Sequence, residues 1–214
     1  EAASAIREQI ESSGFHGNVL DINDIRQIQD VRLASLRLLA SQIKERNVPG
    51  ALAELGVYRG DFAAEINLIF PDRTIYLFDT FAGFDVRDVD VEDNVPKMNF
   101  SDTSIEIVKN VLPNSSQAVF VPGRFPDSLS SCKNLPDTYA LVSLDADLYS
   151  STLEGLKYFW PVLSVGGAIL IHDYNSTQFP GVHEAVSEYC GKMKLFPVPL
   201  MDLHATAILM KQGY

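Results

Sequence analysis

Acidic and imidazole side chains stand at three points of the sequence where an apolar run ends. Asp145 and Asp147 follow the run YALVSL, His172 and Asp173 follow GAILI, and Asp79 follows TIYLF. Hard divalent cations such as Mg²⁺ take carboxylate oxygens, and a carboxylate beside a metal can accept a proton from a hydroxyl group. If these runs are neighbouring strands about 4.8 Å apart, Asp145, His172 and Asp173 can meet on one ion.

Two of these residues also have simpler interpretations. Asp147 is expected to cap the helix that follows it, because a carboxylate accepts hydrogen bonds from the first free N–H groups of a helix. His172 is either a metal ligand or a hydrogen-bonded residue at a strand end. Asp145 and Asp173 are harder to explain without a ligand, because a charge so close to a buried sheet needs a partner.

The segment Glu54–Gly60 (ELGVYRG) closes an apolar run and opens an amphipathic one. Glycine permits a tight turn and a close approach of the backbone to a ligand, and the helix N-terminus that follows offers unpaired N–H groups. The pattern is shorter than the G-x-G-x-x-G motif, and Glu54 suits an amino or sulfonium cation. Asp79 lies 79 − 56 = 23 residues beyond Gly56, close to the spacing of about 20 at which an acid binds a ribose. Together these features favour an adenosine-type cofactor, although a plain strand-to-helix turn would also use glycine.

The elements that must position these residues alternate between apolar runs and amphipathic segments. A helix is expected from Ile25 to Ile43, ending before Pro49 and Gly50. Strands are expected at 51–57, 74–80, 118–122, 139–145 and 167–173, helices at 61–70, 102–112, 152–163 and 182–192, and a closing hairpin at 195–200 and 205–211. This alternation predicts an α/β fold with a buried parallel sheet, in which ligands bind beyond the carboxyl ends of the strands. Gly123 ends the third of these strands and joins the group of candidate site residues.

The composition limits the partners of the protein. The chain has 214 residues, with 28 Asp plus Glu against 17 Lys plus Arg and a net charge of −11, which suits one domain and disfavours nucleic acid. No apolar run approaches the roughly 18 residues of a membrane span, and residues 1–15 contain no apolar run of the kind expected in a secretory signal. Cys132 and Cys190 match no metal or disulfide spacing. A reducing, cytoplasmic location without a membrane partner is therefore expected.

Four runs of the sequence resemble the macrocin O-methyltransferase family, whose members methylate sugar hydroxyls on macrolides and related natural products. The runs are VPGALAELGVYRGDFA, YLFDTFAGF, LVSLDADLYSSTLEGLKYFWPVLSVGGAILIHDY and GVHEAVSEY. The resemblance extends from about Arg32 to Tyr189. It implies a Rossmann-like class I methyltransferase sheet, mostly parallel, with a C-terminal antiparallel strand and helices on both faces. Residues 1–48 would form a helical segment covering the site, and residues 49–214 the methyltransferase domain.

The same resemblance implies a binding site for S-adenosylmethionine and one for Mg²⁺ or another divalent cation. The cofactor-binding residues would be Glu54, Gly56, Val57, Tyr58, Gly60, Asp79, Thr80, Phe81 and Gly123. The metal ligands would be Asp145, His172 and Asp173, with Asp145 also the general base. In the family the second and third ligands are an Asp-Asp pair before Tyr. His172 departs from that pattern, so the site would favour softer divalent ions, be weakened, or work without metal.

The expected reaction is the transfer of a methyl group to a hydroxyl of a small molecule, by a protein that is a homodimer only by analogy. One alternative is a degenerate module that binds the cofactor without catalysis, and a less favoured one is a nicotinamide-dependent oxidoreductase.

The acid-rich run 85–93 (DVRDVDVED) is interpreted as a solvated loop, or else as a lid over the acceptor or a selector of cationic acceptors. His16 is taken as an exposed residue or part of the acceptor pocket, and His183 and His204 as structural.

Overall fold

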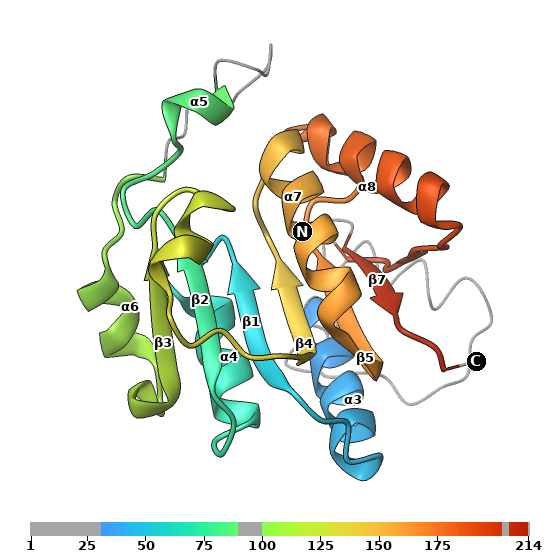
Figure 1. Ribbon diagram of the computed structural model, residues 1–214, viewed down its shortest axis with the longest axis horizontal. Helices are drawn as coiled ribbons and strands as arrows, with labels where there is room; N and C mark the ends of the chain where they lie inside the picture. The colour runs from blue at the N-terminus through green and yellow to red at the C-terminus, as the bar shows by residue number, and fades with distance from the viewer. Residues whose placement is uncertain (1–30, 90–99, 203–205, 214) are drawn as a thin grey trace, which may run out of the picture.

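A seven-stranded sheet runs through the part of the chain that the computed structural model describes, residues 31–89, 100–202 and 206–213 (Figure 1). The strand order is β3-β2-β1-β4-β5-β7-β6, and the expected α/β class is confirmed. The strands are β1 (Ala51–Leu55), β2 (Ile75–Asp79), β3 (Ala118–Pro122), β4 (Tyr139–Leu144), β5 (Leu163–Ile171), β6 (Val198–Pro199) and β7 (Ala207–Met210).

The first five strands are parallel, and the predicted hairpin closes the sheet in the antiparallel sense. β1 pairs with β2 on one side and with β4 on the other, whereas β7 runs antiparallel to β5 and β6 to β7. Every residue of β4 is buried, which explains why its sequence is a nearly continuous apolar run. β2 and β3 lie on one side of β1, whereas β4 and β5 lie on the other side. At such a reversal of strand order a crevice opens, here at the carboxyl ends of β1 and β4.

Helices cover both faces of this sheet (Figure 1). α3 (Val31–Glu45), α4 (Asp61–Ile69) and α6 (Ile105–Val111) bury Leu36, Ile66 and Val108 in one apolar cluster. α7 (Tyr149–Val162) and α8 (Pro180–Met193) contribute to a second cluster on the other face. Shorter helical segments are α5 (Val86–Val89), η1 (Ser115–Gln117) and η2 (Asp127–Ser131). Burying each large aliphatic side chain contributes roughly 1.5–3 kcal/mol, so the two layers hold the strand ends in place.

One sequence expectation near the site is wrong. α7 begins at Tyr149, and its N-cap is Leu148 without any side-chain hydrogen bond, so Asp147 does not cap it. β4 ends at Leu144, and Asp147 has a left-handed backbone (φ 60°) in the turn between β4 and α7. The start of the helix expected from Ile25, and most of the expected segment 1–48, lie outside the described residues. Within the described ranges, no helix is long and apolar enough to cross a membrane.

Candidate active site

Glu54 is a buried carboxyl group at the end of β1. It pairs in register with Ser143 of β4, whose hydroxyl donates a hydrogen bond to Glu54 Oε1 at 3.1 Å. The side chain is 1% exposed, and Oε2 has no hydrogen-bond partner among the residues that the structure describes. Burial raises the pKa of Glu54 to about 8, against a smaller lowering effect of Arg32. A cationic ligand group that reached Oε2 would satisfy this atom and favour the ionised carboxylate.

The two glycines of the Glu54–Gly60 loop are required for different reasons. Gly56 has φ +84°, and a Cβ there would stand 1.8 Å from the carbonyl oxygen of Asp145. Gly60 is the N-cap of α4 with φ +86°, and its Cβ would stand 2.8 Å from Val108 Cγ1 on α6. Gly56 therefore lets the ends of β1 and β4 meet at the crevice. Gly60 serves the packing of α4 against α6, and it does not line the cavity that opens at these strand ends.

Asp79, at the end of β2, organises the loop after β1. Its Oδ2 accepts hydrogen bonds from the backbone N–H groups of Val57 at 2.6 Å and Tyr58 at 2.9 Å, and its Oδ1 accepts one from Phe81 at 2.7 Å. The carbonyl group of Asp79 accepts a hydrogen bond from Gly123 N–H at 2.9 Å. A carboxylate has about four lone-pair sites, so Asp79 retains acceptor capacity for a ligand hydroxyl.

Other candidate residues fall inside and outside the cavity. Thr80 lines it, and its hydroxyl donates to the carbonyl group of Gly83. The ring of Phe81 instead packs on Phe120, with 5.9 Å between ring centroids, and does not line the cavity. His183 stacks on Tyr174 at 4.9 Å, in agreement with a structural role.

The remaining single residues add no further candidate. His16 and His204 lie outside the described residues. Cys132 is half-buried and Cys190 is buried, and both are free thiols.

Asp145, His172 and Asp173 form a compact cluster at the ends of β4 and β5. Their potential ligand atoms all lie within 4.8 Å of one another. His172 Nδ1 lies 2.9 Å from both Asp145 Oδ1 and Asp173 Oδ2. Burial acts to lower the pKa of His172, but the charge of Asp145 and the hydrogen bonds to both carboxylates outweigh it and raise the pKa to about 9. The three residues were expected from the sequence to lie close enough to share one ion, and the structure brings them together.

Asp147 adds a further acidic group to the cavity wall beside this cluster. Burial, followed by the charges of Asp145 and Asp173, raises the pKa of Asp147 well above its ordinary value. In contrast, burial acts to raise the pKa of Asp145, but the charges of Arg32 and His172 outweigh it and lower the pKa. The pKa values of these two acids, two residues apart, are thus shifted in opposite directions, and Asp145 is the more readily ionised of the two.

Arg32 is a site residue that the sequence analysis did not select. It lies in the first turn of α3, and both Nη atoms donate to Asp145 Oδ2 at 3.1 Å, while Nη2 also donates to Ser143 Oγ at 3.2 Å. Arg32 lies four residues before Leu36, on the same face that α3 buries against the protein. An arginine on the apolar face of a predicted helix is the feature of the sequence that could have identified it as a site residue.

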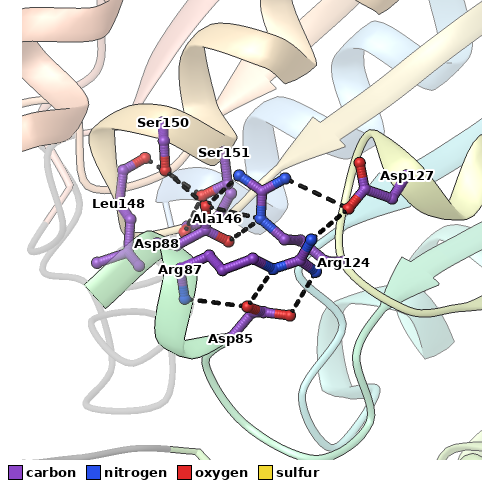
Figure 2. A network of polar contacts seen from close by, with 9 residues as sticks. All are labelled: Asp85, Arg87, Asp88, Arg124, Asp127, Ala146, Leu148, Ser150 and Ser151. Carbon is purple, nitrogen blue, oxygen red and sulfur yellow. Dashed lines mark hydrogen bonds and ion pairs between the residues drawn. The ribbon is translucent and has the colours of Figure 1, made fainter. Parts of the chain in front are cut away.

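A second polar network contributes Asp85, Asp88 and Arg124 to the cavity wall. Figure 2 shows its side chains and their contacts. Arg124 donates to Asp88 through Nε at 3.0 Å and Nη2 at 2.7 Å, and Ser150 donates to the same carboxylate at 3.0 Å. Arg87 bridges Asp85 and Asp127, each at 2.9 Å. Asp88 is only 6% exposed, so the interpretation of 85–93 as a solvated loop is wrong for this residue. Residues 90–93 lie outside the described ranges.

The charged groups at the strand ends border one cavity of about 570 Å³, a size typical of small-molecule sites; Arg32, Asp88, Asp147 and Asp173 line it. Glu54, Gly56 and Asp79 line one part of it, and Asp145 and His172 line another. Four aromatic rings form part of its wall: Phe100 lies 5.1 Å from Tyr58, 5.4 Å from Phe84 and 6.5 Å from Phe179, measured between ring centroids. The cavity therefore offers a buried carboxyl, a polar cluster and an apolar wall within one space.

Comparison with known proteins gives consistent matches over most of the chain. The family model described as Macrocin-O-methyltransferase (TylF) matches residues 24–212. Demethyldecarbamoylnovobiocin O-methyltransferase of Streptomyces niveus is 32% identical over 179 residues, which are 77% of this chain and 67% of the relative. Mycinamicin III 3''-O-methyltransferase of Micromonospora griseorubida is 31% identical over 175 residues, 74% of this chain and 67% of the relative.

The fold agrees with a solved structure as well. The structure of the O-methyltransferase NovP is similar with a TM-score of 0.71 and 29% sequence identity, covering 85% of this chain and 80% of that one. The Rossmann-like sheet expected from the sequence is thus shared with that enzyme.

Proposed function

The chain belongs to the macrocin O-methyltransferase family, and on this premise we propose that it transfers a methyl group from S-adenosylmethionine to a sugar hydroxyl of a natural product. The observation that supports this assignment best is the single cavity bordered by both the Glu54–Gly60 loop and the Asp145–His172–Asp173 cluster. A donor held at the first and an acceptor held at the second would lie within one enclosed space. Bringing the two together in this way supplies most of the rate in such reactions.

The loop after β1 fits S-adenosylmethionine, which would supply an electrophilic methyl group on a sulfonium. Glu54 Oε2 is buried without a hydrogen-bond partner from the described part of the chain, and an amino group of the cofactor would be a suitable donor to it. The N-terminus of α4 provides N–H groups for a carboxylate. Asp79 holds the backbone of Val57 and Tyr58 and keeps capacity for a ribose hydroxyl. Gly123 borders the same part of the cavity, as do Val57, Tyr58 and Thr80.

The acidic cluster fits a divalent cation. Donor separations of 2.9 Å between His172 Nδ1 and each carboxylate are close to those of adjacent ligands around one ion with bonds of about 2.1 Å. Asp145, His172 and Asp173 would hold the ion, which would polarise an acceptor oxygen as a Lewis acid. The imidazole makes the set more favourable for Mn²⁺-like or Zn²⁺-like ions than a purely carboxylate set.

Asp145 is the proposed proton acceptor for the acceptor hydroxyl. Its lowered pKa keeps it ionised at neutral pH, and it faces the cavity beside His172. Asp147 is the second candidate, because it lines the same cavity and burial raises its pKa, which makes its carboxylate the stronger base of the two. The neighbouring aromatic wall of Phe84, Phe100 and Phe179 would pack against apolar parts of the acceptor.

The test is a transfer assay with S-adenosylmethionine labelled in its methyl group. Demethyldecarbamoylnovobiocin and mycinamicin III are offered as acceptors, in EDTA and in the presence of Mg²⁺, Mn²⁺ or Zn²⁺. Label in the acceptor supports the proposal, and its dependence on a metal supports the cation site. Calorimetry with S-adenosylhomocysteine runs in parallel. Binding without transfer to any acceptor would favour the non-catalytic module, and no binding at all would contradict the assignment of the cofactor loop.

A further inference from the structure

The guanidinium group of Arg32, on helix α3, contacts Asp145 of the Asp145–His172–Asp173 cluster, although 113 positions separate the two residues in the sequence. Both of its Nη atoms donate to one oxygen of Asp145, Oδ2, at 3.1 Å. The other oxygen, Oδ1, faces His172 Nδ1 at 2.9 Å. Two donors on one oxygen restrict rotation of the carboxylate, so Asp145 presents Oδ1 to the side of His172.

The guanidinium is itself held from several sides. Its Cζ atom lies over the ring of Phe62, on α4, 3.7 Å from the ring centroid, where the charge–quadrupole attraction favours it. Nη2 also donates to Ser143 Oγ, which in turn donates to Glu54 Oε1. The side chain of Arg32 is 12% exposed. A group fixed in this way can position Asp145, and it links the carboxyl at the proposed cofactor loop to the one at the proposed reaction centre.

We propose that Arg32 is a positioning residue that orients Asp145 for methyl transfer. This inference rests on the proposed function, since it assigns Asp145 a part in the reaction. Arg32 acts through Asp145, because its guanidinium has only N–H donors and no acceptor site for the proton of a hydroxyl. A lysine would supply the charge but not the two donors in one plane, so the planar fork is the property that matters.

A purely structural role would also be consistent with the contact to Phe62, so the experiment needs a matched control. Arg37 provides it: it lies on the same helix and pairs with Glu65 of the same neighbouring helix at 3.7 Å, but its side chain is 65% exposed. Arg37→Ala therefore removes an α3–α4 contact without touching Asp145. Arg32→Lys retains the charge, and Arg32→Ala opens space for a guanidinium ion from solution.

The first measurement needs no acceptor. Denaturation of Arg32→Ala, Asp145→Ala and the double variant forms a thermodynamic cycle, and we expect the two residues to be coupled by about tenfold in the unfolding equilibrium constant. Coupling below about twofold would show that the ion pair is not formed in solution and would overturn the proposal.

The second measurement is turnover with an acceptor that the wild-type enzyme methylates. We expect kcat of Arg32→Ala and Arg32→Lys to fall about 100-fold, as for a displaced catalytic group, while KM for S-adenosylmethionine changes less than about threefold. Added guanidinium chloride, below denaturing concentrations, should restore kcat of Arg32→Ala at least about tenfold and leave Asp145→Asn unchanged. Arg37→Ala should turn over like the wild type.

Each other outcome has a defined meaning. Wild-type kcat in Arg32→Ala, or a loss of kcat matched by an equal loss of S-adenosylhomocysteine binding, would overturn the positioning role. A loss that guanidinium does not restore, together with a lowered melting temperature, would assign Arg32 to folding alone. A wild-type protein that methylates no acceptor counts against the proposed function, whereas an active enzyme that tolerates Arg32→Ala counts against this inference only.

Discussion

Gly56 lies directly against the carbonyl group of Asp145, so that a Cβ on residue 56 would stand 1.8 Å from the oxygen. Asp145 N–H in turn donates to the carbonyl group of Leu55 at 2.8 Å. The backbone of the loop that we assign to the cofactor therefore contacts the backbone of Asp145, whose carboxylate we assign to the reaction. A change in one of them is expected to move the other.

Gly56→Ala should lower the free energy of unfolding by at least about 2 kcal/mol, because left-handed strain and a backbone collision act together. We also expect S-adenosylhomocysteine binding to be lost. The matched control is Gly191→Ala on α8, where a Cβ would meet nothing within 4 Å. There, chemical denaturation should find stability unchanged or raised by up to about 1 kcal/mol, since alanine favours a helix. Equal stability of the two variants would contradict the close approach.

Glu54 should make the protein less stable as pH rises. Its pKa is about 8 in the folded state and 4.5 in the unfolded state, so the folded state binds the extra proton between these values. The stabilising contribution is complete below pH 4.5 and is lost as pH rises to 8, at up to about 1.4 kcal/mol per pH unit. Urea denaturation from pH 5 to 8 should therefore show a steeper decline for the wild type than for Glu54→Gln. Glu106→Gln, an exposed change, should follow the wild type.

Asp145→Asn should reduce kcat by about 100-fold or more, the usual contribution of general base catalysis, with S-adenosylhomocysteine affinity changed by less than about threefold. Asp147→Asn is the comparison variant, since it removes a charge from the same cavity wall. Initial rates and calorimetry on both variants separate the two candidates. If Asp147→Asn is inactive and Asp145→Asn retains turnover, the role of proton acceptor passes to Asp147.

His172→Asp should change the metal preference of the cluster. Replacing the imidazole by a carboxylate restores the Asp-Asp pair of the family and adds a negative charge, so Mg²⁺ affinity should rise by about tenfold while the preference for Zn²⁺ declines. Calorimetric titration with each metal alone gives both values. His183→Asp, on the exposed side of Tyr174, is the control and should alter neither affinity. An unchanged ratio of the two metals in His172→Asp would remove His172 from the ligand set.

Asp88→Asn should lower the free energy of unfolding by about 3 kcal/mol, because it leaves Arg124 with an incompletely paired charge at a buried position. Asp127→Asn is the matched control: Asp127 also pairs with Arg124, at 3.5 Å, but its side chain is 54% exposed. It should cost no more than about 1 kcal/mol by the same denaturation measurement. Similar losses for both variants would mean that burial of Asp88 has no energetic consequence.

The order and type of the elements could be predicted from the sequence because both depend on local periodicity. Short apolar runs such as YALVSL are typical of strands covered on both faces, and the amphipathic segments between them are typical of covering helices. Parallel strands then bring their carboxyl ends to one edge of the sheet, so Glu54, Asp79, Asp145 and Asp173 were predicted to lie together without any knowledge of contacts.

The tertiary structure alone decided which distant side chains contact the residues of the site. Arg32 meets Asp145 because α3 packs against α4 and β5, and Gly60 must be glycine because α6 lies against it. Asp88 is buried because Arg124 and Ser150 converge on it from two other elements, and Asp147 faces the cavity because the chain turns left-handed there. Local periodicity carries no information about which distant side chain fills a given space. The sequence by itself therefore determined the sheet and the edge that bears the site, whereas long-range packing decided the orientation and charge state of the groups within it.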